Sequence, residues 1–190
     1  MKRQLLSTLL VFCMVLTMLI CPTFATSVFP DVDEYTEYAE AVGYISEVGI
    51  MVGDENGNFN PNKTLTRAEM ATIICKMLDM TENLSASSAF SDVPTNHWAN
   101  RYIGKATELG ILSGYGNGNF GPYDILTYEQ ALTMIIRMLG LQDEAISAGG
   151  YPNGYIEIAC EYGYTSRISA EQGDQLARWQ VAIILYNILV

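Results

Sequence analysis

The chain has 190 residues and an acidic composition, with 21 acidic and ten basic side chains and a formal net charge of −11. This charge argues against nucleic acids and anionic membrane surfaces as partners, because both would repel the protein. An anionic ligand would have to be held by local contacts against the overall field. The length is sufficient for one domain with its own core.

The segment from Met1 to Ala25 has the features of a secretory signal peptide. Lys2 and Arg3 precede an uncharged apolar run over residues 5–20, and small residues near its end predict cleavage after Ala25. The run is short for a membrane span, so we expect a secreted protein with no transmembrane anchor after cleavage. Eight basic and 21 acidic side chains remain in residues 26–190, which gives a net charge of −13.

Two segments of the remaining chain repeat one another at a constant offset. Phe29–Val32 recurs as Phe90–Val93, and matches continue without a gap as far as Leu65 and Leu126, each followed by a threonine. Ungapped similarity of this length indicates a tandem repeat.

A third, degenerate copy follows. Its second half matches the second copy with Leu176 on Leu126, and this alignment places Arg178 at the position that Arg67 holds in the first copy. We therefore predict a single domain over residues 26–190 with a first unit (29–80), a second unit (90–140) and a third unit (151–190).

Each unit is predicted to form a helix, a glycine-rich loop and a second helix. In the second unit we expect a first helix over His97–Leu109 that ends at Gly110, and a second helix that starts at Thr127. Gln130 has the spacing to complete a capping box with Thr127. Residues 81–89 and 142–150 are expected to be linkers. One such hairpin cannot bury its apolar stripe alone, so we predict an all-α domain in which the three units share one core.

The loop over residues 113–124 contains four glycines and one proline, which exclude regular structure through most of it. Phe120 within this loop is expected to be a buried apolar anchor. The corresponding segment Asp54–Asn58 of the first unit is similar to a calcium-binding loop. Its glycine stands at position four instead of six, and Leu65 occupies position twelve instead of a glutamate, so no metal is expected.

The second helix of the first unit is predicted to start at Arg67. Thr66 and Glu69 have capping-box spacing, and apolar residues then follow with helical periodicity. Arg67 would stand beside free backbone N–H groups, where an anion can bind. It could be a solvated surface arginine in an ion pair that contributes about 0–1 kcal/mol, or it could capture a carboxylate through both guanidinium nitrogens. Thr66 and Glu69 have a structural explanation as caps, whereas Arg67 has none.

Four other side chains are candidates for more than one role. His97 is the only histidine, and it lacks a nucleophile or a second metal ligand at suitable spacing, so we interpret it as a residue of the first turn before a helix. No cofactor and no catalytic site are expected. Trp98 is either a core residue or a platform that stacks on a sugar, and Tyr151 is its counterpart in the third unit. Cys75 and Cys160 are interpreted as small buried residues, with a disulfide between them as the alternative.

Taken together, Phe-x-Asp-Val, His-Trp-Ala, Gly-Ile-x-x-Gly, Gly-Asn-Phe-x-Pro and Leu-Thr-Arg-Ala-Glu resemble the pattern of the S-layer homology domain over residues 29–189. The resemblance implies a pseudo-threefold, three-pronged spindle around a central helical bundle. It also implies a non-catalytic module on a Gram-positive-type cell surface. Such a module is anchored to the cell wall because grooves between its prongs bind a secondary cell-wall polysaccharide, often one with a pyruvylated terminal sugar.

The resemblance also implies ligand-binding roles for seven residues: Arg67 for the carboxylate, Trp98, Gly53, Gly114 and Ser113 along the sugar, and more weakly Arg178 and Tyr151. The sequence departs from the family pattern at Tyr128, which replaces the arginine of the second unit. At most two grooves therefore keep an arginine. An adaptor that contacts other surface proteins, having lost most of its polysaccharide sites, is the alternative function.

Overall fold

The computed structural model describes residues 29–82 and 84–190, so the predicted signal peptide lies outside the described residues. Within these ranges the protein is all-α, as predicted, and has no strand beyond isolated bridges. Seven helices lie in the described part: α2 (Ala39–Glu47), α3 (Arg67–Met77), α4 (Asn100–Glu108), α5 (Tyr128–Met138), α6 (Gln142–Ser147), α7 (Asn153–Glu161) and α8 (Arg178–Leu189). None of these helices has both the length and the apolar character needed to cross a membrane.

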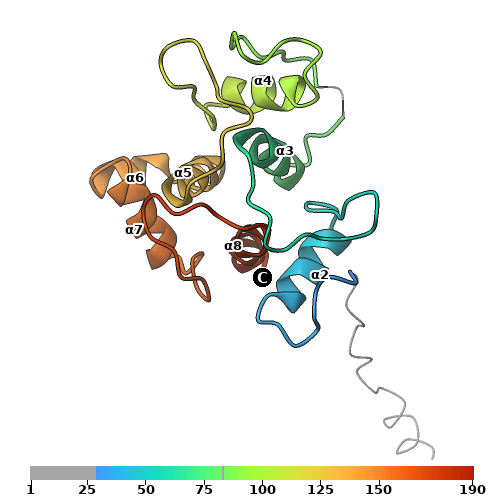
Figure 1. The fold of residues 1–190 in the computed structure, drawn as a ribbon. Coiled ribbons are helices and arrows are strands. Elements are labelled where there is room, and N and C mark those ends of the chain that lie inside the picture. Colours follow the sequence, from blue (N-terminus) through green and yellow to red (C-terminus); the bar gives the residue numbers. More distant parts are fainter. Residues whose placement is uncertain (1–28, 83) are drawn as a thin grey trace, which may run out of the picture.

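The helices pack between units instead of within them (Figure 1). α4 packs on α3, α7 packs on α5, and α2 packs on α8. In the described residues no first helix packs on the second helix of its own unit. The two described helices of a unit therefore do not pack on each other as the expected hairpin. The loop between them carries the chain from one packed helix pair to another. Each unit buries its apolar stripe against a neighbouring unit, and the three share one core as expected.

Three leucines, one just before each of α3, α5 and α8, join the units at the centre of the molecule. The Leu65 N–H donates to the Leu176 carbonyl at 3.3 Å, Leu176 N–H to Leu126 at 3.3 Å, and Leu126 N–H to Leu65 at 2.8 Å. These bonds form a closed ring, and all three side chains are fully buried. The ring brings the first turn of each of these helices against the inter-helix loop of another unit.

The Phe-x-Asp-Val motif holds the glycine-rich loop in place. The two carboxylate oxygens of Asp92 accept hydrogen bonds from the Phe120 and Gly121 backbone N–H groups at 2.8 and 2.7 Å. Phe90 packs on Phe120, with ring centroids 5.5 Å apart, and Phe120 is fully buried as predicted. A Cβ atom on Gly114 would collide with the Phe90 ring and the Asn119 carbonyl, so the loop requires glycine there.

Several helix boundaries differ from the expectations. α4 begins at Asn100, three positions after His97, because the His97 Nδ1 atom accepts from the Ala99 N–H at 3.1 Å and so occupies the turn before the helix. The predicted linker over 142–150 is wrong, since residues 142–147 form α6, which buries Ala145 against α7. The predicted helix end at Gly110 is confirmed by its left-handed φ of 73°.

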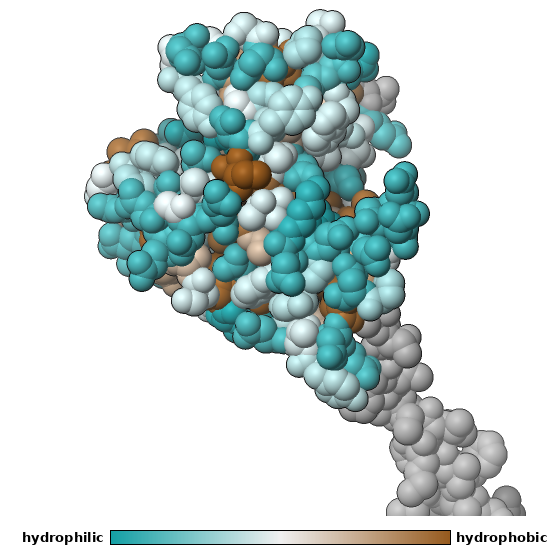
Figure 2. All heavy atoms as spheres, viewed as in Figure 1, coloured by the Kyte–Doolittle hydropathy of each residue, from teal (hydrophilic) through white to brown (hydrophobic). Residues whose placement is uncertain are grey.

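Both cysteines of the described chain are free thiols, so the alternative of a disulfide is wrong. Cys75 is buried, which raises the pKa of its thiol to about 11 and keeps it protonated. Cys160 is exposed, contrary to the expectation of burial. The face of the protein seen in Figure 2 is largely hydrophilic and shows apolar residues only in small separate patches.

Carboxylates that hold caps and loops should make the fold sensitive to acid. Backbone hydrogen bonds lower the pKa of Asp54. At Glu69 and Asp92 burial opposes ionisation, but hydrogen bonds outweigh it and the pKa of each is lowered. The unfolded chain, with carboxyl pKa values near about 4, binds more protons than the native state below that pH. We expect the urea midpoint to be constant above pH 5 and to fall between about pH 4 and pH 2. A midpoint that stays constant over this range would contradict this assignment.

Candidate functional site

The amino-terminal end of α3 is not an open anion site. The predicted capping box forms: the Thr66 hydroxyl accepts from the Glu69 N–H at 3.2 Å, and the Glu69 carboxylate accepts from the Thr66 N–H at 2.8 Å. However, the Arg67 and Ala68 N–H groups donate to the carbonyls of Asp124 and Pro122, at 3.0 and 3.1 Å. The expectation of free N–H groups is wrong, because the leucine ring brings the loop of the second unit onto this helix end. An anion here can be bound only by side chains.

Arg67 is 4% exposed, so the interpretation of it as a solvated surface arginine is wrong. Its Nε atom donates to the Phe120 carbonyl at 2.9 Å, and its Nη2 atom donates to the Ser113 carbonyl at 3.0 Å. The guanidinium lies over the rings of Phe120 and Tyr115, at 4.6 and 4.8 Å from their centroids. Arg67 therefore has the structural role that the sequence did not reveal, since it binds the loop of the second unit to the first. Burial lowers its pKa, but an arginine stays charged at neutral pH.

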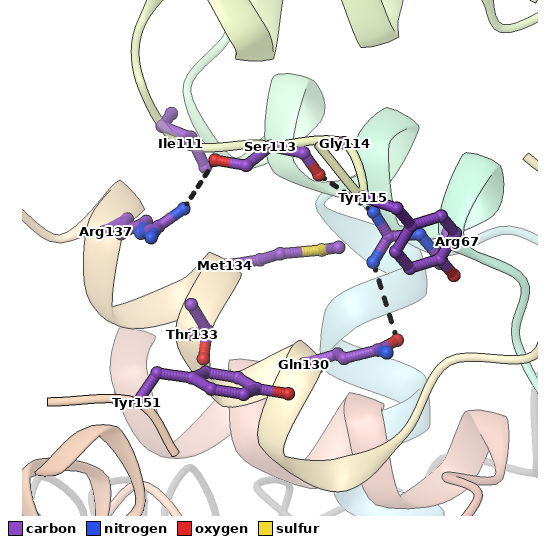
Figure 3. A pocket seen from close by; sticks show the side chains of 10 residues that line it. All are labelled: Arg67, Ile111, Ser113, Gly114, Tyr115, Gln130, Thr133, Met134, Arg137 and Tyr151. Atoms are coloured by element: carbon purple, nitrogen blue, oxygen red, sulfur yellow. Dashed lines mark hydrogen bonds between the residues drawn. The ribbon is translucent and has the colours of Figure 1, made fainter. Parts of the chain in front are cut away.

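A cavity of about 270 Å³ lies beside Arg67 (Figure 3). All three units contribute to its lining: Arg67 from the first, Tyr151 from the third, and from the second Ile111, Ser113, Gly114, Tyr115, Gln130, Thr133, Met134 and Arg137. None of these lining residues is acidic. The volume is close to the lower limit of about 300 Å³ for typical small-molecule pockets, which fits one sugar ring better than a long segment of polymer.

Arg137 is the second cation of this cavity and was not identified from the sequence. It lies on the opposite side of the cavity from Arg67 (Figure 3), and its Nη1 atom donates to the Ser113 hydroxyl at 3.0 Å. Its guanidinium carbon is 5.7 Å from the centroid of the Tyr155 ring. A basic residue in the last turn of a helix is usually explained by its favourable interaction with the helix dipole, so this position alone is no reason to assign Arg137 to a binding site. The signal available in the sequence was that a basic residue, Lys76, stands at the same position of the first unit.

Gln130 faces the cavity instead of capping its own helix. The predicted capping box at Thr127 is wrong, because the Thr127 side chain makes no cap bond and its buried hydroxyl has no partner among the described residues. The Gln130 amide oxygen lies 3.5 Å from Arg67 Nη1. By contrast, the side chains of Glu69 and Gln180 both accept from the N–H of their own N-cap residues. Helix α5 thus lacks a cap that is typically worth about 1 kcal/mol.

The structure divides the seven predicted site residues into two groups. Arg67, Ser113, Gly114 and Tyr151 line the cavity, whereas Gly53, Trp98 and Arg178 do not. Trp98 is 56% exposed and stacks on His97, with ring centroids 5.6 Å apart, so the interpretation of Trp98 as a core residue is wrong.

Arg178 makes the same two hydrogen bonds to the loop of the first unit that Arg67 makes to the loop of the second. Its Nε atom donates to the Phe59 carbonyl at 2.8 Å, and its Nη2 atom donates to the Val52 carbonyl, next to Gly53, at 3.0 Å. A Cβ atom on Gly53 would lie 2.6 Å from the Phe29 ring, so this glycine serves the packing of the loop. At the third equivalent position the buried Tyr128 supplies no cation.

The calcium-like segment of the first unit is held by internal hydrogen bonds. One carboxylate oxygen of Asp54 accepts from the Asn56 and Asn58 N–H groups, both at 2.9 Å, and the other accepts from the Asn60 amide at 2.9 Å. The Asp54 carboxylate therefore closes its own loop.

Comparison with known proteins supports the repeat relation between the first and second units. Residues 28–71 and 89–132, in the first and second units, match the model of the S-layer homology domain. The match does not include the third unit, whose assignment as a repeat stays a prediction.

Relatives among curated proteins are surface proteins and a wall enzyme. The chain is 34% identical to a cell surface protein of Thermoanaerobacter kivui, over 96% of this chain and 24% of the relative. It is 31% identical to the surface-layer 125 kDa protein of Lysinibacillus sphaericus, over 76% of this chain and 13% of the relative. An uncharacterized cell wall amidase of Bacillus anthracis is 27% identical, over 79% of this chain and 28% of the relative. The chain thus spans less than a third of the length of each of these relatives.

Proposed function

Because residues 28–71 and 89–132 match the S-layer homology domain, we propose that this chain is a secreted, non-catalytic module that anchors to the cell wall. The names of its relatives, which refer to the cell surface, the surface layer and the cell wall, support this location. We further propose that residues 151–190 are a third, degenerate repeat of a pseudo-threefold spindle. Two observations support this: Leu176 completes the ring of leucines, and Arg178 binds the first unit as Arg67 binds the second.

The cavity beside Arg67 is the observation on which the proposed ligand depends. The chain beyond Ala25 has a net charge of −13, yet this cavity is lined by two arginines and no acidic residue. Among the described residues Arg67 Nη1 makes only the long contact with Gln130, so this nitrogen can still donate to a ligand oxygen. The Tyr151 ring offers a flat apolar surface for a sugar face. We propose that the ligand is a secondary cell-wall polysaccharide with a carboxylate on a terminal sugar, such as a pyruvate ketal.

Sedimentation with purified cell walls tests this function. The protein is expected to pellet with intact walls and to stay in the supernatant after mild acid has removed pyruvate ketals. Equal pelleting before and after the treatment would contradict a pyruvylated ligand. Failure to pellet with intact walls, combined with retention on isolated surface proteins, would contradict polysaccharide anchoring and support the adaptor function.

A further inference from the structure

Ser113 fixes the two arginines of the cavity relative to each other. Its carbonyl accepts from Arg67 Nη2 at 3.0 Å, and its hydroxyl accepts from Arg137 Nη1 at 3.0 Å. The two guanidinium groups come from α3 of the first unit and α5 of the second, and they lie on opposite sides of the cavity (Figure 3). A ligand in the cavity therefore meets two cations whose separation is set by one residue.

The Asp124 and Asp92 carboxylates favour the charged form of Arg67 from beyond ion-pair distance, and the described residues hold neither guanidinium group of the cavity in a direct ion pair. In the part of the chain that the structure describes, ion pairs form between other residues, and neither Arg67 nor Arg137 takes part in one. Within the same ranges the buried Nε atom of Arg137 has no hydrogen-bond partner, which is unfavourable for a buried polar group. A ligand with one negative charge would satisfy one guanidinium and leave the other uncompensated.

We propose that the cavity selects a saccharide that bears two separate acidic groups, one bound by Arg67 and the other by Arg137. This inference rests on the proposed function, and it adds that Arg137 determines specificity. The acidic group bound by Arg137 is expected to be an anion with at least two acceptor oxygens, which a guanidinium can bind through two parallel hydrogen bonds. Either a uronic acid carboxylate or a phosphate monoester on the neighbouring sugar has this chemistry.

Titration calorimetry with three defined saccharides tests the proposal. The probes are a pyruvylated monosaccharide, the same sugar linked to a uronic acid, and the same sugar linked to a phosphorylated sugar. We expect the wild-type protein to bind at least one of the two diacids about tenfold or more tightly than the monoacid. The preferred diacid identifies the second group as carboxylate or phosphate.

Variants of Arg137 separate recognition from folding. Arg137→Gln is expected to lower the affinity for the preferred diacid to about that for the monoacid, and Arg137→Lys should restore part of the preference. Lys76→Gln removes the basic residue at the equivalent position of the first unit, where its ammonium group binds the Gly49 carbonyl, and should keep the full preference. Urea unfolding of each variant shows that it is folded under the conditions of the titration.

Three outcomes would overturn the inference. Equal affinity of the wild-type protein for the monoacid and both diacids would show that Arg137 does not bind a second anion. A loss of monoacid and diacid affinity by the same factor in folded Arg137→Gln would assign Arg137 a structural role only. Failure of the wild-type protein to bind any of the three probes would contradict the proposed function itself, and this inference with it.

Discussion

Replacing Arg67 with alanine is expected to weaken binding to the polysaccharide by at least about 1–3 kcal/mol, the range for the loss of a charge-assisted hydrogen bond to the ligand. This corresponds to a rise in Kd of roughly five- to 150-fold. The reason is that, in the ranges the structure describes, Arg67 is the cation that the first unit contributes to the cavity lining, and one of its nitrogens can still donate to a ligand. Pull-down or calorimetry with purified polysaccharide measures the change. A Kd that is unchanged within error would contradict the proposed site.

The stability of this variant must be measured in parallel. Arg67→Ala also removes the donors to the Phe120 and Ser113 carbonyls, and each buried acceptor left without a partner costs about 1–3 kcal/mol. Arg178→Ala is the matched control, because it removes the two equivalent hydrogen bonds, which Arg178 of the third unit donates to the Phe59 and Val52 carbonyls of the first unit. We expect both variants to lower the urea midpoint, but only Arg67→Ala to weaken binding under conditions in which both are folded. Equal losses of binding would indicate that the effect acts through stability.

Local patterns in the sequence were sufficient for much of the fold. The capping box at Thr66 and the helix end at Gly110 each depend on residues within a few positions of one another, and Phe120 was predicted as a buried anchor from its place within its own loop. Such features are set by backbone hydrogen bonding and local packing, so their residue spacing can be recognised in the amino-acid sequence alone. The constant offset between the first and second units then transfers each prediction from one unit to the next.

What the sequence did not show was how units contact one another. The N–H groups at the start of α3 were expected to be free, and only the loop of the second unit satisfies them. Gln130 has correct capping-box spacing, yet it faces Arg67, which belongs to another unit. Arg137 joins the cavity because Ser113 lies between it and Arg67. Long-range packing decides these contacts, and it can override a local preference of about 1 kcal/mol.

Truncating Phe120 to alanine should cause the largest loss of stability in this part of the protein. Its side chain is fully buried, packs against Phe90 and lies under the guanidinium of Arg67. Removal of a fully buried phenylalanine typically costs about 3–5 kcal/mol, because both burial and packing are lost. Phe120→Leu keeps most of the volume and should cost less than about 1.5 kcal/mol. Urea unfolding measures both. A loss for Phe120→Ala no larger than that of an average substitution, about 1 kcal/mol, would show that the loop is not held by this anchor.

Phe59 of the first unit is a control for Phe120, because it is equally buried but lies under Arg178 instead of Arg67. It is fully buried in the first unit and lies under Arg178, with the guanidinium carbon 4.6 Å from the ring centroid. Phe59→Ala should therefore destabilise the protein about as much as Phe120→Ala. The two should differ in binding, because the Phe120 ring lies under the guanidinium of Arg67, which lines the cavity, whereas the Phe59 ring lies under that of Arg178, which does not. Under conditions that keep both variants folded, we expect Phe120→Ala to weaken polysaccharide binding and Phe59→Ala to retain it. The reverse result would place the polysaccharide site beside Arg178 instead.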